Sequence, residues 1–207
     1  MQKTLIIYKS ETGFTQKYAK WLSNELSCDI CDLKDFSKDK INNYDILIYG
    51  GGIYAGQING FKDFKNMVPS DKKLILFMTG ATPLDESDTI QKAFDTNLTK
   101  DEQNKIPHFY AASGLNYEKM SFKHKMMMKG LILMLKNKQP EFCEMISKSF
   151  DSSDFSYLDG LWNVLRVCRF LYKNNIKGPL ITFSIFTFYF KIDFWSFYSS
   201  YFLSYID

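Results

Sequence analysis

The segment TLIIYKSETGFT spans residues 4–15 of this 207-residue chain. Its first part, TLIIY (4–8), is a short apolar run of the kind that forms a buried strand. A polar loop follows, and apolar residues then recur near helical spacing at Phe14, Tyr18, Trp21, Leu22 and Leu26. The stretch therefore predicts a strand that turns into a helix through a hydroxyl-rich loop.

This loop has the groups that hold a phosphate. The first N–H groups of a helix lack an acceptor within it and lie at the positive end of its dipole. Ser10, Thr12 and Thr15 add hydroxyls, and Gly13 lets an anion approach the backbone closely. Neither a G-x-x-x-x-G-K loop nor a G-x-G-x-x-G fingerprint is present here. The alternative is a cluster that only caps the helix, although capping needs a single hydroxyl.

The same alternation continues along the chain. Apolar runs predict four more strands, at 28–33, 45–50, 73–80 and 108–114, and helical patterns lie at 59–68, 86–104, 121–138 and 155–172. Strands that alternate with helices form a parallel sheet covered on both faces. Right-handed crossovers then favour a doubly wound, five-stranded α/β domain with strand order 2-1-3-4-5.

Two further loops are expected at the carboxyl ends of the strands. GGGIYAG (50–56) has four glycines in seven residues, which would let the main chain lie against a flat ligand while Tyr54 offers a ring for stacking. The alternative is an ordinary flexible loop. Thr79-Gly80-Ala81-Thr82-Pro83 follows the fourth strand. Open α/β sheets bind ligands at this edge, beside the point where the strand order reverses.

These segments resemble the flavodoxin family. SETGFT (10–15) resembles its T/S-x-T-G-x-T phosphate loop, and GGGIYAG is similar to the G-S-P-I-Y-A-G loop of the subgroup that includes menaquinone-dependent protoporphyrinogen IX dehydrogenases. FYAASGLNYEKMSFKHKMMMKGLILMLK (109–136) and FDSSDFSYLDGLWNVL (150–165) resemble later segments of that subgroup. The resemblance covers about residues 3–170. It departs at Gly51-Gly52, where Ser-Pro or Ala-Ser is usual, and at 113–117, which lacks the usual Asp.

The resemblance implies a flavodoxin-like fold that binds FMN non-covalently. No metal is expected, because His108 and His124 form no metal-binding pattern with any cysteine or carboxylate. By this resemblance, Thr12, Gly13 and Thr15 would hold the phosphate, and residues 50–56, 79–83 and 113–117 would frame the ring. The implied contacts come from Ser10, Glu11, Thr12, Gly13, Phe14, Thr15, Gly51, Gly52, Ile53, Tyr54, Ala55, Gly56, Thr79, Gly80, Ala81, Ser113, Gly114, Leu115, Asn116 and Tyr117. The flavin would carry the chemistry, so no catalytic side chain is expected.

Two classes of function are compatible with such a cofactor site. The subgroup implies a flavoenzyme that takes hydride from a porphyrinogen or another hydrophobic substrate and passes electrons to a quinone. The alternative is a flavodoxin electron carrier that docks protein redox partners. Carrier flavodoxins are typically acidic, whereas this chain has a net charge of +3, which favours the enzyme.

Two segments indicate contact with a membrane surface. Residues 119–138 combine six lysines with apolar residues, and 180–206, within an extension at 173–207, is rich in aromatic residues. Neither apolar part of the extension reaches the roughly 20 residues of a spanning helix. We therefore expect shallow attachment to anionic lipid. The alternatives are a solvated face on a core helix, and an extension that packs on the 1–172 domain or has no role.

The remaining polar motifs predict little chemistry. Cys28 and Cys31 form a C-x-x-C, but their place on a short strand would separate them too far for a disulfide, so we expect packing residues. His124 is expected to be exposed. The N-terminal apolar run is too short for a signal peptide, which favours a cytoplasmic domain. No basic stretch is interleaved with aromatics as nucleic-acid binding needs.

Overall fold

The computed structural model describes residues 3–69 and 71–165. Five parallel strands form the sheet: β1 (Thr4–Lys9), β2 (Asp29–Asp32), β3 (Ile46–Tyr54), β5 (Lys73–Gly80) and β6 (His108–Ala112). Their order is β2-β1-β3-β5-β6, and the short β4 (Gln57–Ile58) pairs antiparallel with β3. Numbered among the parallel strands alone, this is the predicted order 2-1-3-4-5. The doubly wound α/β fold is confirmed, and the extension at 173–207 lies outside the described residues.

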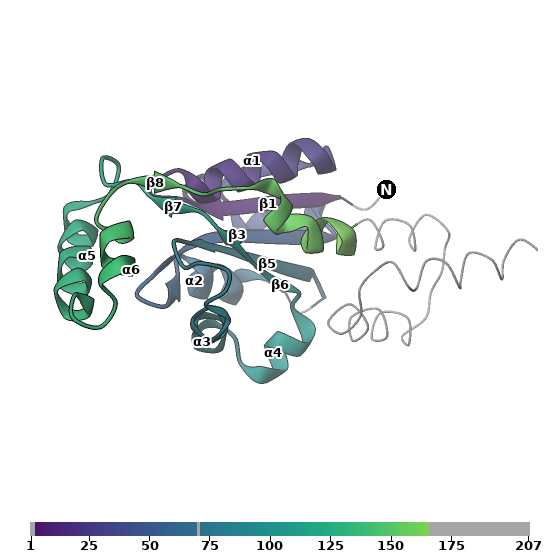
Figure 1. The fold of residues 1–207 in the computed structure, drawn as a ribbon. Helices are drawn as coiled ribbons and strands as arrows, with labels where there is room; N and C mark the ends of the chain where they lie inside the picture. The colour runs from purple at the N-terminus through teal and green to yellow at the C-terminus, as the bar shows by residue number, and fades with distance from the viewer. Residues whose placement is uncertain (1–2, 70, 166–207) are drawn as a thin grey trace, which may run out of the picture. The chain divides into compact units, whose positions relative to one another are not determined.

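Helices cover both faces of the sheet (Figure 1). The sequence of β1 is apolar because its alternate residues face two different cores. Leu5 and Ile7 belong to one buried core, and Ile6 and Tyr8 belong to the other. The first core is closed by α2 (Phe61–Met67) and α3 (Ser87–Asn97). The second is closed by α1 (Phe14–Leu26) and by the chain from the 3-10 turn Phe155–Leu158 through the helical residues 159–165.

The single helix predicted at 86–104 is wrong, because the chain forms two helices there. α3 ends at Asn97, and α4 (Lys100–Lys105) begins after Thr99. The Thr99 hydroxyl accepts from the Glu102 N–H, and the Glu102 carboxylate accepts from the Thr99 N–H, which completes a capping box. Leu98 lies between the helices in an extended conformation and is buried, so the break places an apolar side chain in the core.

The glycine-rich segment is a strand rather than the predicted loop. β3 continues through Gly50, Gly51 and Gly52 in register with β5, and the chain reverses only at Ala55-Gly56, where both φ angles are positive. A Cβ atom on Gly50 would overlap the ring of Phe77, and one on Gly51 would lie 2.5 Å from the side chain of Ile58. The first two glycines therefore allow close packing inside the domain rather than approach to a ligand.

The C-x-x-C is a packing feature in the structure, as predicted. Cys31 lies on β2 and Cys28 immediately before it, and no disulfide joins their thiols. Burial raises the pKa of the Cys31 thiol, which favours the protonated, unreactive form.

A helical hairpin stands beyond the carboxyl ends of the strands (Figure 1). It consists of α5 (Phe122–Leu135) and α6 (Pro140–Ile146), between the short paired strands β7 (Gly114–Leu115) and β8 (Phe150–Asp151). The prediction of one helix at 121–138 is correct for α5 but misses α6, whose first residue is a helix-starting proline. None of the residues of α5 is buried, so it is not the core helix that we considered. Within the described residues, no helix has the length and hydropathy to cross a membrane.

Candidate functional site

The loop between β1 and α1 leaves helical N–H groups available to a ligand. Gly13 is the N-cap of α1 with φ 100°, and no side chain caps this helix. The Ser10 hydroxyl accepts the N–H of Gly13 at 3.1 Å, which closes the turn. The N–H of Lys17 bonds back to the Gly13 carbonyl at 2.9 Å, whereas the N–H groups of the preceding turn have no acceptor in the helix. The hydroxyls therefore shape the loop rather than cap the helix.

The other two hydroxyls of this loop have different surroundings. Thr15 is buried, and its hydroxyl is 2.8 Å from that of Thr79 at the end of β5, so the pair joins two loops of the site. The Thr12 side chain lines the adjacent cavity. Its hydrogen bond with Tyr54 lowers the pKa of that phenol, but burial outweighs it and raises the pKa to about 12. Tyr54 is therefore a neutral hydrogen-bonding group at physiological pH.

The segment after β5 is held by its neighbours. The N–H and the hydroxyl of Ser113 both donate to the Gly80 carbonyl, at 2.8 and 3.0 Å. The Tyr110 hydroxyl donates to the carbonyl of Thr82 at 2.7 Å. These bonds fix the chain from Gly80 to Thr82 against β6, which preorganises this wall of the site.

The hairpin is tied to the phosphate loop through Glu11. The His124 Nδ1 atom lies 2.7 Å from one Glu11 carboxylate oxygen, and the N–H of Ser121 donates to the other at 2.9 Å. The His124 ring also stacks on Tyr54, with centroids 4.4 Å apart and planes 20° apart. The side chain of His124 is only 21% exposed, so our prediction of an exposed histidine is wrong. The contact between Glu11 and His124 could not be predicted from the sequence, because 113 positions separate the two residues.

A cavity of about 240 Å³ lies between these loops and the hairpin. One wall contains predicted site residues, namely Thr12, Phe14, Thr15, Gly52, Ile53, Tyr54, Ala55, Thr79, Gly80, Ala81, Ser113, Gly114, Leu115 and Asn116. Thr82, from the segment 79–83 that was expected to frame the ring, lines the cavity as well. The opposite wall, which was not predicted, is apolar and consists of Met120, Met128, Leu131, Phe142 and Ile146. The volume is below the 300–1,000 Å³ usual for drug-sized ligands, so it has room for only part of an FMN-sized molecule.

Six predicted site residues do not line this cavity: Ser10, Glu11, Gly13, Gly51, Gly56 and Tyr117. The first three belong to the phosphate loop itself, and Gly56 forms the turn of the β3–β4 hairpin. Gly51 is packed against Ile58. The Tyr117 hydroxyl donates to the Ile146 carbonyl at 2.6 Å, so this residue supports the α5–α6 hairpin.

Comparison with known proteins identifies the family. A family model described as a flavodoxin domain matches residues 5–141, which is more than half of the chain. The chain belongs to the flavodoxin domain family. It is also 38% identical over 84 residues to an uncharacterized protein of Methanocaldococcus jannaschii, MJ0298, a match that covers 39% of this chain and 56% of that protein. The chain thus spans just over half the length of this relative.

Solved structures give more distant likenesses. A flavoprotein from Lactobacillus acidophilus, determined in complex with FMN, is 19% identical with a TM-score of 0.36, and the match covers 54% of this chain and 93% of that one. A WrbA-like flavodoxin from Agrobacterium tumefaciens is 17% identical with a TM-score of 0.37, over 60% of this chain and 88% of that one.

Membership of the flavodoxin family confirms FMN as the predicted cofactor. The site of this chain fits the group. The unbonded N–H groups at the start of α1 suit a phosphate, and the left-handed Gly13 leaves them uncovered by a side chain. Beside them, Gly52, Thr79–Ala81 and Ser113–Asn116 form the wall on which a flavin ring would lie. When bound, FMN supplies reversible one- and two-electron redox chemistry.

Proposed function

We propose that this chain is an FMN-dependent oxidoreductase that takes electrons from a hydrophobic substrate, such as a porphyrinogen, and passes them to a quinone. The observation that carries the proposal is the composition of the cavity. Its flavin-side wall is built from polar loops and its hairpin-side wall from apolar side chains such as Met128, Leu131 and Phe142. A flat apolar molecule would displace water from that second wall, which favours its binding next to the flavin.

The covering hairpin distinguishes this proposal from an electron carrier. A carrier exchanges electrons with a protein whose surface docks at the flavin edge, so that edge must remain accessible to a large partner. Here α5 and α6 contribute Met128 and Phe142 to the cavity, and the Glu11–His124 pair holds α5 on the phosphate loop. This arrangement suits a small ligand that enters beneath the hairpin. Because the cavity has room for only part of an FMN, the proposal requires the hairpin to move outward when flavin and ligand are both bound.

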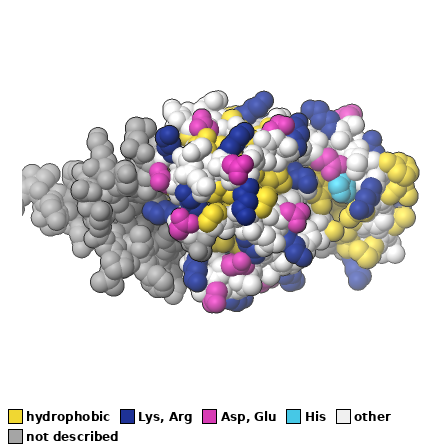
Figure 2. Space-filling view, turned by 180° about the vertical axis from the view of Figure 1, so that it is seen from behind, with side chains coloured by type: hydrophobic (Ala, Val, Ile, Leu, Met, Phe, Trp, Pro, Cys, Tyr) yellow, Lys and Arg dark blue, Asp and Glu magenta, His cyan; other side chains and the backbone are white. Residues whose placement is uncertain are grey.

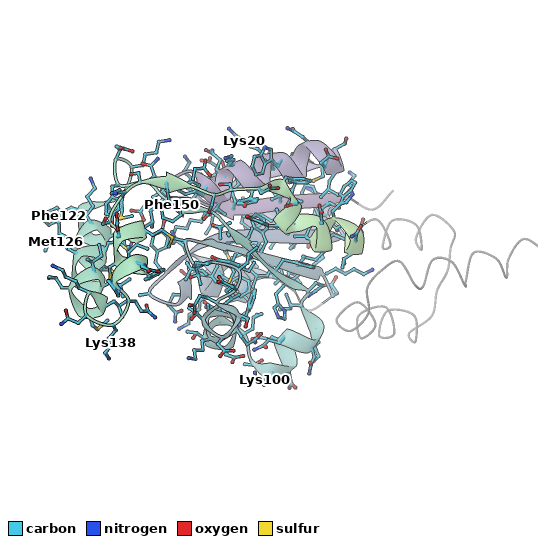
Figure 3. All side chains as sticks on the ribbon, in the orientation of Figure 1. Lys20, Lys100, Phe122, Met126, Lys138 and Phe150 are labelled. Carbon is cyan, nitrogen blue, oxygen red and sulfur yellow. The ribbon has the colours of Figure 1, made fainter. Side chains whose placement is uncertain are left out.

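The outer side of the same hairpin supports a role at a membrane surface. Phe122, Leu133 and Met134 are 79%, 76% and 69% exposed, which is unusual for large apolar side chains on one helix. Hydrophobic side chains gather at the end of the domain formed by the hairpin, with basic side chains close by (Figure 2), and Phe122 and Met126 project outward from α5 (Figure 3). We propose that this face contacts anionic lipid, the phase in which a quinone dissolves.

The second predicted membrane contact, 180–206, lies outside the described residues and stays a proposal. The lysines that accompany the apolar face of α5 are described, and Lys123 and Lys129 are exposed. Their positive charge favours a surface that carries anionic headgroups.

The test of the proposed reaction is steady-state kinetics of the FMN-loaded chain with a porphyrinogen as donor and a menaquinone analogue as acceptor. Phe142→Ala removes a ring from the apolar wall, so we expect its KM for the quinone to rise at least severalfold while FMN stays bound. Met145→Ala, on an exposed position of the same helix, is the matched control and should leave KM unchanged. No turnover by the wild-type chain, together with rapid reduction by a ferredoxin-type protein, would instead favour the electron carrier.

A further inference from the structure

The phosphate loop lacks a positive charge of its own, although it must hold a dianion. Residues 10–15 contain one charged side chain, and it is the acidic Glu11. The phosphate of FMN carries about −1.5 to −2 charges at pH 7, as other phosphomonoesters do. The N–H groups of α1 offset only part of this charge, so a cation near the loop would strengthen binding.

Lys119 brings a cation to this position from a distant part of the chain. Its ammonium nitrogen lies 3.8 Å from the place that a Cβ atom on Gly13 would occupy. Gly13 is the N-cap of α1, so the ammonium stands beside the helix start. Within the described residues, no carboxylate lies within ion-pair distance of Lys119. The charge is therefore not neutralised by an acidic neighbour.

The main chain around Lys119 is anchored on both sides. The Asn116 side chain accepts the N–H of Lys119 at 3.1 Å, and Met120 is buried. The next residue, Ser121, donates its N–H to Glu11, as described above. Residues 116–124, which we call the strap, thus cross from the cavity to the phosphate loop in a defined path.

The strap also forms an ion pair and a hydrogen bond with the carboxylate of Glu11, which would otherwise repel a phosphate. Burial raises the pKa of Glu11, but hydrogen bonds from His124 and Ser121 outweigh it and lower the pKa overall. The Glu11 carboxylate is therefore charged and is paired with the strap. The strap therefore pairs with the carboxylate of Glu11 and also places the ammonium of Lys119 beside the N–H groups of the phosphate loop.

We infer that Lys119 is a ligand of the FMN phosphate and that the strap completes the phosphate site. The inference concerns the cofactor and does not depend on which substrate the flavin oxidises. It predicts that part of the affinity for FMN comes from a residue that lies outside the loop motif of residues 10–15 and more than a hundred positions away in the chain.

The experiment compares FMN with riboflavin, which has the same ring system but no phosphate. Both are titrated into the full-length apoprotein at low and high salt, with quenching of flavin fluorescence as the signal. Lys119→Gln should raise the Kd for FMN by about tenfold, equivalent to about 1.4 kcal/mol, at low salt. The Kd for riboflavin should not change. The salt dependence of FMN binding should become weaker, because one ion pair has been removed.

Lys129→Gln is the matched control, because it removes an equal charge from an exposed position on α5 outside the strap. It should leave the ratio of the two Kd values close to that of the wild type. Three results would overturn the inference: an unchanged FMN affinity in Lys119→Gln, equal losses for FMN and riboflavin, or the same loss in Lys129→Gln. The second would mean that Lys119 only supports the fold, and the third that any positive charge on this part of the domain suffices.

Discussion

Gly13 has the backbone conformation that the phosphate loop depends on. Its φ of 100° lies in the left-handed region, where a side chain costs about 1–2 kcal/mol. Gly13→Ala should therefore lower the free energy of unfolding by about 1 kcal/mol and also weaken FMN binding, because the strained turn displaces the N–H groups beside it. Denaturant unfolding and flavin titration measure the two effects.

The control for this substitution is Gly130→Ala in α5. Gly130 has open space around its Cβ position and lies within a helix, so alanine should be neutral or stabilise by about 0.5–1 kcal/mol. If Gly13→Ala unfolds at the wild-type denaturant concentration and binds FMN equally well, the left-handed turn is not required for the site.

Glu11 gives the domain a stability that depends on pH. Because its pKa is lowered in the folded protein, its contribution is complete above the ordinary value of 4.5 and disappears as the pH falls through the lowered value. We expect Glu11→Gln to destabilise the domain by on the order of 1 kcal/mol at pH 7, since the carboxylate is partly exposed. The difference from the wild type should shrink below pH 4.5. An equal difference in denaturant midpoint at both pH values would contradict the ion pair.

At this scale the sequence predicted the local contacts and missed the distant ones. The place of Thr12 and Gly13 in the site could be predicted, because a phosphate loop is a continuous segment in which the glycine and the hydroxyl residues are neighbours in the sequence. Lys119 and His124 looked like members of a solvated basic helix. Their roles depend on how the hairpin folds back on Glu11, and no spacing pattern in the chain records a contact over such a separation.

The β3–β4 hairpin depends on one amide of α3. The Asn97 side chain accepts the N–H of Ile58 at 2.9 Å and donates to the Gly56 carbonyl at 2.7 Å. Asn97→Ala would leave both backbone groups without these partners, which should cost about 1–3 kcal/mol. Hydrogen exchange should then become faster in residues 53–58. Gln91→Ala, on the exposed face of α3, should change stability by less than about 0.5 kcal/mol. Unchanged exchange in Asn97→Ala would mean that the hairpin is held otherwise.

The exposed face of α5 predicts how the chain partitions between water and vesicles. Replacing Phe122 and Met134 by serine removes two large exposed side chains and no buried one. In flotation with anionic vesicles, we expect the floated fraction of the full-length double variant to fall by at least half, since less apolar area enters the interface. Leu84→Ser, which removes an exposed apolar side chain outside the hairpin, is the control and should leave the floated fraction unchanged. Flotation equal to that of the wild type would exclude α5 as the contact.

Element boundaries show where sequence patterns are sufficient and where packing intervenes. β1, β3, β5 and β6 were predictable because the alternate residues of their apolar runs enter two cores. β2 has an aspartate at each end and no buried residue, so its prediction depended on its place after a helix. The prediction missed the split between α3 and α4, although the spacing of Thr99 and Glu102 is typical of a capping box. The length of β3 could not be predicted, because its glycines suggested a loop, and only the close approach of Phe77 and Ile58 explains them.

For the whole domain, the fold places three loops and one hairpin around a single cavity at the carboxyl edge of the sheet. The loops follow from the strand order and could be predicted with it. The apolar wall could not, because α6 is short and the side of α5 that faces the cavity is not marked by periodicity. The proposal of a hydrophobic substrate depends on this apolar wall.

Anaerobic spectroscopy tests most directly whether the chain exchanges electrons with small hydrophobic molecules through FMN. The oxidised, FMN-loaded, full-length chain is mixed with a porphyrinogen or, separately, with a reduced ferredoxin-type protein, and the reduced chain is mixed with a menaquinone analogue, while the visible spectrum is recorded. We expect the porphyrinogen to bleach the flavin bands rapidly and the menaquinone analogue to restore them. The proposal fails if neither small molecule changes the flavin bands and the protein donor alone bleaches them.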